Sequence, residues 1–265
     1  NKIPELERGA KPRPISKLGV IGGGTMGSGI TIAALNSGLP VTMVERDQES
    51  LERGIENVKK VYRRDVEKGR LSQEKADKIL SNYSTSTQLK DLSDKDMIIE
   101  AVFEELDVKK GVFSQLNDIA KEGAVLASNT SYLDIDKIAS ATDRVGDVIG
   151  LHFFSPANIM RLLEIVVPTN VKDDVVATGF QLAKILKKVP VRAGNCDGFI
   201  GNRVLENYAK AANYMMEDGT SPYDIDKAIV EFGYPMGPFQ MFDLAGGDIG
   251  WADRKRKAAF RSVSY

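Results

Sequence analysis

The chain contains a single histidine, His152, and imidazole is the side chain whose ordinary pKa lies nearest neutrality, which suits it to proton transfer. Glu164 follows twelve residues later, across a turn expected at Ser155 and Pro156. The two segments are expected to be neighbouring antiparallel strands, so the carboxylate would face the imidazole, fix its tautomer and stabilise its charged form. A lone histidine is more often structural, and the alternative for Glu164 is an ordinary strand residue that points to solvent.

Four consecutive polar residues, Ser128 to Ser131, follow a short apolar run. Such a stretch is typical of a turn or a helix cap. It can also supply hydrogen-bonding groups to a ligand. In that interpretation Ser131, together with Asn202 from a later helix, orients a substrate oxygen and stabilises negative charge that develops on it.

Three glycines, Gly22, Gly24 and Gly27, have G-x-G-x-x-G spacing between an apolar run and a segment with helical character. In a dinucleotide-binding turn the first permits a tight bend, the second lets the backbone approach a diphosphate, and the third lets the helix pack on the strand. The helix N-terminus then favours the negative charge. The alternative is a purely structural strand–turn–helix unit.

Glu45 ends the next apolar run, 18 positions after Gly27, close to the ~20 expected for the acid that binds the adenosine ribose. Its charge would repel a 2′-phosphate, which favours NAD over NADP. Arg46 would favour NADP, because a guanidinium here can hold the extra phosphate. The simpler interpretation is that Arg46 is a solvent-facing cation beside Asp47. A base next to a nicotinamide indicates oxidation of an alcohol.

Apolar runs alternate with amphipathic segments along most of the chain. We expect strands at 18–21, 40–44, 97–102, 124–127, 145–151, 161–167 and 189–192, and helices at 30–35, 47–68, 72–81, 106–120, 134–140 and 171–187. This order predicts an α/β fold of Rossmann type, with a doubly wound, mostly parallel sheet covered on both faces. The chemistry-bearing residues come at the ends of different strands, so they should meet along one edge of the sheet.

The chain is expected to have two domains. Residues 1–16 carry three prolines and six charges and are predicted to be a linker from an upstream domain. Residues 17–193 form the cofactor domain, and 194–265 a smaller all-helical domain with helices at 199–217 and 221–233. Because this last part is short and the chain starts at Asn1, we expect a truncated helical domain within a piece of a longer protein.

Composition excludes several classes of protein. With 36 basic and 37 acidic residues and a net charge of −1, the chain should have no general affinity for nucleic acid or anionic membranes. A single cysteine, Cys196, excludes an internal disulfide framework, and no metal site is expected. No apolar run is long enough to span a membrane.

Six motifs occur in a characteristic order, namely GGGTMGSGI, IIEAVFEEL, SNTS, GLHFFSPANIMRLLEI, GNCDGFIGNR and GYPMGPFQMFDL. Over roughly residues 17–250 the chain resembles the L-3-hydroxyacyl-CoA dehydrogenases of fatty-acid β-oxidation, and most closely the dehydrogenase part of peroxisomal multifunctional enzymes. The resemblance implies oxidation of an L-3-hydroxyacyl-CoA to the 3-oxoacyl-CoA with NAD as cofactor.

The resemblance also implies roles for individual residues. His152 would be the general base, Glu164 its partner, and Ser131 and Asn202 the ligands of the substrate oxygen. Glu104 would lie near the nicotinamide, in a cofactor-binding set of Gly22, Gly24, Thr25, Met26, Gly27, Glu45, Ala101, Glu104 and Asn129. Arg63 and Arg64 would meet the CoA phosphate; otherwise they belong to a solvated helix face.

Three further properties follow from the resemblance alone: an upstream enoyl-CoA hydratase domain in the same chain, a homodimer formed through the helical domain, and a peroxisomal location, with the mitochondrial matrix or a bacterial cytoplasm as alternatives. Two other functions stay open. One is a non-catalytic NAD(H)-binding module, and the other is a dehydrogenase that acts on a small hydroxy acid without CoA.

Overall fold

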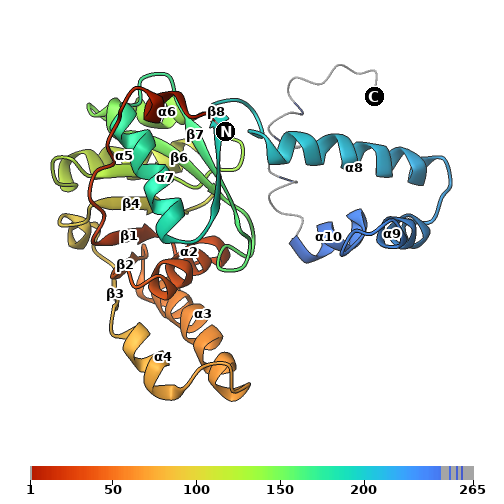
Figure 1. Ribbon diagram of the computed structural model, residues 1–265, viewed down its shortest axis with the longest axis horizontal. Helices are drawn as coiled ribbons and strands as arrows, with labels where there is room; N and C mark the ends of the chain where they lie inside the picture. Colours follow the sequence, from red (N-terminus) through yellow and green to blue (C-terminus); the bar gives the residue numbers. More distant parts are fainter. Residues whose placement is uncertain (1, 246–250, 252–254, 256–257, 259–265) are drawn as a thin grey trace. The chain divides into compact units, whose positions relative to one another are not determined.

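The computed structural model describes residues 2–245, 251, 255 and 258 (Figure 1). Its contacts divide the chain into two compact units, Asn1–Cys196 and Asp197–Tyr265. The division falls three residues after the boundary at 193/194 that the sequence predicts. Part of the predicted helical domain, 194–265, lies outside the described residues.

The first unit is built on one sheet of eight strands in the order β3-β2-β1-β4-β5-β6-β7-β8 (Figure 1). All neighbouring strands are parallel except β6 and β7, which run antiparallel. The order 3-2-1-4-5-6 is that of a doubly wound dinucleotide-binding fold, so the predicted fold class is confirmed. The strands are β1 (Leu18–Ile21), β2 (Val41–Val44), β3 (Tyr83–Ser86), β4 (Met97–Glu100), β5 (Val125–Ser128), β6 (Val148–Phe153), β7 (Leu162–Val167) and β8 (Val189–Gly194).

Helices cover both faces of this sheet, which is why its inner strands are buried along their whole length. One core joins alternate strand residues to α2, α3 and α7, and the other strand residues face α5 and α6, where Phe113 and Ile138 are fully buried. The helices of this unit are α1 (Pro4–Glu7), α2 (Thr25–Asn36), α3 (Gln48–Glu67), α4 (Gln73–Leu80), α5 (Leu106–Ile119), α6 (Ile135–Ala139) and α7 (Asp173–Ile185).

Local signals explain where several helices begin. Asp47 precedes α3 and its carboxylate accepts the Ser50 N–H at 2.7 Å, while Ser72 accepts the Lys75 N–H before α4. Both residues satisfy N–H groups that the first turn leaves unpaired. On α3 the apolar residues Leu51 and Val58 face the core, as their spacing predicts.

The structure departs from the predicted elements in several places, among them the short helix α1 within the predicted linker. β3 is an additional strand, polar in sequence, which pairs with β2 at the edge of the sheet. α2 starts at Thr25, directly after the glycine turn, and not at Ile30. The strand expected from Val145 begins at Val148, after a short 3₁₀ turn.

The first residues of the chain lie against the first unit. Glu5 is buried, although the rest of α1 is largely exposed. Ion pairs join this segment, expected to be a linker, to β8, to α7 and to the turn before β6. They are Glu5 with Arg192 at 2.8 Å, Arg8 with Asp173 at 2.7 Å, and Arg13 with Asp147 at 2.9 Å and Asp174 at 2.8 Å.

The second unit is helical as far as it is described, with α8 (Gly201–Glu217), α9 (Pro222–Glu231) and α10 (Pro238–Ala245). Pro222 opens α9 behind the cap Ser221. Asp226 on α9 accepts the N–H groups of Phe239 and Gln240 at 2.9 Å each, so α9 caps the start of α10. Within the described residues, no helix combines the length and the apolar character needed to cross a membrane.

Candidate active site

The turn after β1 forms a backbone cradle. Gly22 has a φ of 103°, and a Cβ added there would lie 2.6 Å from the carbonyl oxygen of Ala101. A Cβ on Gly27 would lie 1.8 Å from the Gly22 carbonyl oxygen, whereas at Gly24 nothing lies within 4 Å. Close backbone packing therefore demands glycine at the first and last positions, and the middle one leaves open space above the turn.

The start of α2 faces this open space. Gly24 is the cap residue of this helix, and no side chain among the described residues caps its N-terminus. Thr25 is exposed and Met26 is half-buried against the core. Since unpaired N–H groups and the helix dipole both favour negative charge, this end of the helix fits the diphosphate of a dinucleotide.

The carboxylate of Glu45 is fixed against the same turn. It accepts the Gly23 N–H at 2.6 Å and the Arg46 N–H at 3.1 Å. An acid in this place is suited to accept hydrogen bonds from ribose hydroxyls. The guanidinium of Arg46 pairs with Asp47 at 2.9 Å and lies 5.9 Å above the ring of Phe103, so it is the exposed cation beside Asp47 that the simpler interpretation predicts.

His152 and Glu164 stand directly opposite each other on β6 and β7. The Nδ1 and Oε2 atoms lie 2.6 Å apart, and the two side chains are 5% and 1% exposed. The predicted antiparallel pairing is confirmed, and Glu164 does not point to solvent. An ionised carboxylate only accepts hydrogen bonds, so the contact with Glu164 favours the tautomer that has its proton on Nδ1.

A buried ion pair joins the ends of β4 and β5 to α5. Glu100, with no exposed surface, accepts hydrogen bonds from Lys109 Nζ at 2.6 Å, from Ser128 Oγ at 2.7 Å and from the Val102 N–H at 2.8 Å. Lys109 is 1% exposed, and Glu104 Oε2 lies 3.4 Å from its Nζ. One buried cation therefore bridges two carboxylates.

Glu104 holds the polar loop after β5. Its Oε1 accepts hydrogen bonds from the Thr130 hydroxyl group, from the Ser131 N–H at 2.7 Å and from the Tyr132 N–H at 3.2 Å. The sequence places Glu104 near the cofactor but does not predict this bond to the Ser131 loop. The carboxylate thus fixes the backbone of the residue expected to bind a substrate oxygen.

Lys109 and Glu100 are absent from the residues selected by sequence. Two features of the sequence could have identified these residues. Glu100 is the only charge in the apolar run MIIEAV, and Lys109 lies on the apolar stripe of α5 formed by Leu106, Phe113 and Leu116. A charge inside a buried strand and a charge on a buried helix face each require a partner.

The loop after His152 is tied down by a lysine. Lys188 donates from Nζ to the carbonyl oxygens of Ala157 and, at 2.6 Å, of Met160. Burial lowers the pKa of this amine from its ordinary value. A Cβ on Gly29 of α2 would lie 3.0 Å from the Cβ of Ala157, so the same loop packs closely on the cofactor helix.

The remaining predicted residues lie after β5, on α8 and on α3. Asn129 accepts the Phe153 N–H at 2.9 Å through Oδ1. Asn202 is in the first turn of α8, in the second unit. Arg63 and Arg64 are exposed on α3, where Arg63 pairs with Glu56.

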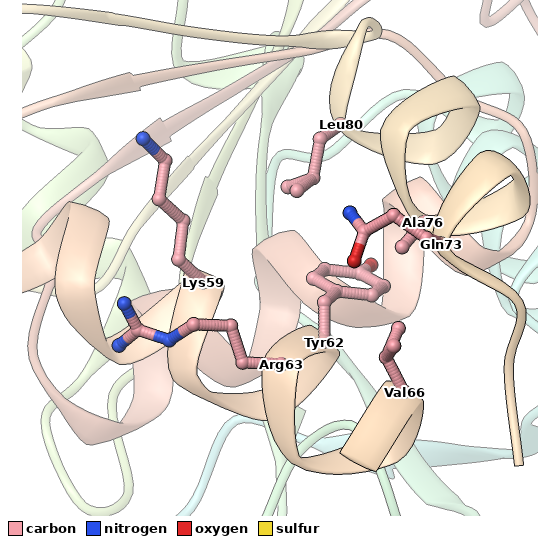
Figure 2. A pocket seen from close by; sticks show the side chains of 7 residues that line it. All are labelled: Lys59, Tyr62, Arg63, Val66, Gln73, Ala76 and Leu80. Carbon is pink, nitrogen blue, oxygen red and sulfur yellow. The ribbon is translucent and has the colours of Figure 1, made fainter. Parts of the chain in front are cut away.

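A small pocket of about 100 Å³ lies between α3 and α4 beside Arg63. Figure 2 shows the side chains of Lys59 and Arg63 on one side of it and those of Val66, Gln73 and Ala76 on the other, with the ring of Tyr62 between them. Val66, Gln73, Ala76 and Leu80 complete the lining. In the described part of the chain, no group of three or more acidic, histidine or cysteine side chains is arranged to hold a metal ion.

Comparison with known proteins gives a consistent result. The family model described as "3-hydroxyacyl-CoA dehydrogenase, NAD binding domain" matches residues 17–196, and "3-hydroxyacyl-CoA dehydrogenase, C-terminal domain" matches 198–264. The peroxisomal bifunctional enzyme of Cavia porcellus is 45% identical over 248 residues, which are 93% of this chain and 34% of that protein. The chain thus spans about a third of the length of this relative.

Two solved structures extend the comparison. The (S)-3-hydroxybutyryl-CoA dehydrogenase of Ralstonia eutropha aligns with a TM-score of 0.85 at 33% identity, covering 91% of this chain and 86% of that one. The dehydrogenase part of multifunctional enzyme 1 from C. elegans aligns with a TM-score of 0.71 at 30% identity, covering 94% of this chain and 58% of that one.

Proposed function

This chain belongs to the 3-hydroxyacyl-CoA dehydrogenase family, and from that premise we propose that it oxidises an L-3-hydroxyacyl-CoA to the 3-oxoacyl-CoA. The observation that carries the proposal is the buried pair of His152 and Glu164 on adjacent strands. The glycine cradle, the uncapped start of α2 and Glu45 support NAD as the cofactor that this site holds.

In the proposed reaction, NAD supplies the acceptor for the hydride that leaves C3 of the substrate. Nε2 of His152 takes the hydroxyl proton, so that the C3–O bond becomes a carbonyl. Glu164 keeps the proton on Nδ1 and stabilises the imidazolium that forms. Ser131, with its backbone held by Glu104, donates a hydrogen bond to the substrate oxygen as negative charge develops.

The CoA part of the substrate is assigned to α3. Arg63 and Arg64 are exposed there, and Arg63 lines the pocket of Figure 2. Guanidinium groups suit phosphate. Replacing both with alanine should raise the KM for the acyl-CoA about 10-fold with little change in kcat, the loss expected for one or two charge-assisted bonds. If free CoA does not inhibit the parent protein, an alcohol without CoA becomes the better substrate.

The central experiment replaces His152 with alanine. We expect NAD binding, measured by fluorescence titration, to stay within about twofold of the parent. NADH formation from L-3-hydroxybutyryl-CoA should fall by about 10²-fold to 10⁴-fold, the usual contribution of a general base. A variant that keeps parental turnover would contradict the mechanism. A parent protein that binds NAD but never turns over would instead be a binding module.

The place of the chain in a larger protein is also a proposal. A relative named as a bifunctional enzyme is about three times as long as this chain, which supports a further domain in the same protein. The resemblance of the sequence motifs suggests that this domain is an upstream enoyl-CoA hydratase. The peroxisomal names of the relatives support a peroxisomal location. Immunofluorescence with a peroxisomal marker would test the location.

A further inference from the structure

The end of β6, which carries His152, extends beyond the strand beside it. The parallel ladder between β5 and β6 ends at the pair Ser128 and Gly150. β6 continues to Phe153 and is paired there with β7 on its other side. After Gly150, β6 therefore has no β5 residue beside it in the described sheet, and no carbonyl of β5 is paired with its N–H groups.

The side chain of Asn129 takes the place of that carbonyl. Its Oδ1 accepts the Phe153 N–H at 2.9 Å, and the two residues are 8% and 2% exposed. Phe153 follows His152 directly in the chain. A buried N–H without an acceptor is costly, so this bond fixes the strand end next to the imidazole.

Asn129 is also anchored on the opposite side. Its own N–H donates to the Glu100 carbonyl oxygen at 2.8 Å, which attaches it to β4. Two residues further on, the Ser131 N–H is held by Glu104. Asn129 thus connects the strand end that carries His152 to the loop that carries Ser131, through contacts that are buried on both sides.

We propose that Asn129 is a positioning residue, which sets the imidazole of His152 relative to the Ser131 loop. The proposal rests on the proposed function for the roles of those two residues, and it differs from the direct cofactor contact that the resemblance implies for Asn129. Since a displacement of about 1 Å of a reacting group can cost about 10²-fold in rate, the loss of this one acceptor should affect turnover more than cofactor binding.

The test compares Asn129→Ala with Asn129→Asp, which keeps an oxygen acceptor in the same place. For Asn129→Ala we expect kcat to fall at least 10-fold, of the order that a small displacement causes, and the Kd for NAD to stay within about twofold. Asn129→Asp should lie between Asn129→Ala and the parent in kcat. If Asn129→Ala folds poorly, Asn129→Asp still tests the proposal.

A second measurement needs no turnover. The chain has one histidine, so the ring ¹⁵N signals in an NMR spectrum belong to His152 without further assignment. We expect these signals to shift in Asn129→Ala without substrate or NAD, and to lie closer to the parent in Asn129→Asp. A variant with a weakened fold but a correctly placed imidazole would leave them unmoved.

Asn117→Ala is the matched control. Asn117 also accepts a backbone N–H through its amide oxygen, that of Asp143 at 2.9 Å, but near the C-terminal end of α5. It should leave kcat and the His152 ring signals unchanged. If Asn129→Ala weakens NAD binding 10-fold while the ring signals stay in place, Asn129 is a cofactor ligand and the proposal is wrong. Unchanged kcat and ring signals in Asn129→Ala would also overturn it.

These outcomes are separate from a failure of the proposed function. If His152→Ala kept parental turnover, the assigned base would be wrong, yet the ring signals would still report whether Asn129 positions the imidazole. If the ring signals moved in Asn117→Ala as much as in Asn129→Ala, the effect would be a general loss of order, and the positioning role would fail alone.

Discussion

At the scale of single residues, the charge on Glu164 can be separated from its hydrogen bond to His152. Glu164→Gln keeps an oxygen at the same distance from Nδ1 but removes the negative charge that stabilises an imidazolium. We expect kcat to fall by about 10²-fold to 10⁴-fold, with an unchanged Kd for NAD. Steady-state rates and NAD titration would measure this.

Glu122→Gln provides the control for that substitution, because Glu122 is exposed in the turn before β5 and should have no effect. A Glu164→Gln variant with the parental kcat would mean that the carboxylate only completes the packing of the sheet.

Residue types and spacing were enough to predict the His152–Glu164 pair, because a short turn between two antiparallel strands brings residues twelve apart face to face. The role of Asn129 could not be predicted in the same way. Its side chain accepts a backbone N–H. Nearly every residue has a backbone N–H, so the residue types do not indicate which one Asn129 binds.

At the scale of elements, the pair of Lys109 and Glu100 connects α5 to β4 inside the protein. Lys109→Met leaves the Glu100 carboxylate buried without its cation, which should lower the free energy of unfolding by about 3–5 kcal/mol. Because Glu104 then loses a neighbour, the Ser131 loop should also exchange its amide hydrogens faster. Urea denaturation and hydrogen exchange would measure the two effects.

A double variant, Glu100→Gln with Lys109→Met, should recover most of that stability, since it leaves no buried charge unpaired. Lys110→Met changes the next lysine along the same helix, which is only half-buried, and should cost less than about 1 kcal/mol. A loss of that small size in Lys109→Met would contradict a stabilising buried ion pair between Lys109 and Glu100.

Elements with a strong apolar period were predicted from the sequence, and those without one were not. β3 has the sequence YSTS and lies at the edge of the sheet, where one neighbour and one partly solvated face impose no apolar run. The start of α2 was missed because Thr25 to Gly29 contains small residues whose helical state depends on packing against the glycine turn.

At the scale of the whole molecule, the contacts of the first residues should make stability depend on pH. Burial alone would raise the pKa of Asp147, but its bonds to Lys172 and Arg13 more than offset this and hold the pKa below its ordinary value. The bond to Arg192 likewise lowers the pKa of Glu5. These contacts therefore stabilise the fold fully above the ordinary carboxyl pKa of about 4, and the stabilisation is lost as the pH falls through the lowered values.

Arg13→Ala tests this dependence. At pH 7 it should lower the free energy of unfolding by about 1–3 kcal/mol, because Asp147 and Asp174 lose a charged donor. The difference from the parent should shrink as the pH falls from 5 to 3, since both proteins then lose the carboxylate. Lys11→Ala, on the exposed part of the same segment, should show a small and constant difference. If the difference in unfolding free energy between Arg13→Ala and the parent does not vary with pH, the assigned ion pairs are contradicted.

Fold class and the family could be recognised from the sequence over nearly the whole chain, whereas the contacts of residues 2–16 could not. Their prolines and charges are typical of a linker, and the two aspartates that pair with Arg13 lie more than 130 residues away. Charged side chains on a proline-rich segment do not indicate which surface, if any, they meet.

The ion pairs of this segment bear on how shorter versions of the protein should be designed. The match to the family model begins at residue 17, and a gene cut at that point would express a protein in which Asp147, Asp173 and Asp174 lose their ion pairs with Arg8 or Arg13. Such a product would leave Asp173 and Asp174 on α7 without their arginine partners and Arg192 on β8 without Glu5. Cloning from residue 2 avoids both. A comparison of the yields and melting temperatures of the two products would show how much residues 2–16 add to the stability of the domain that sequence matching delimits.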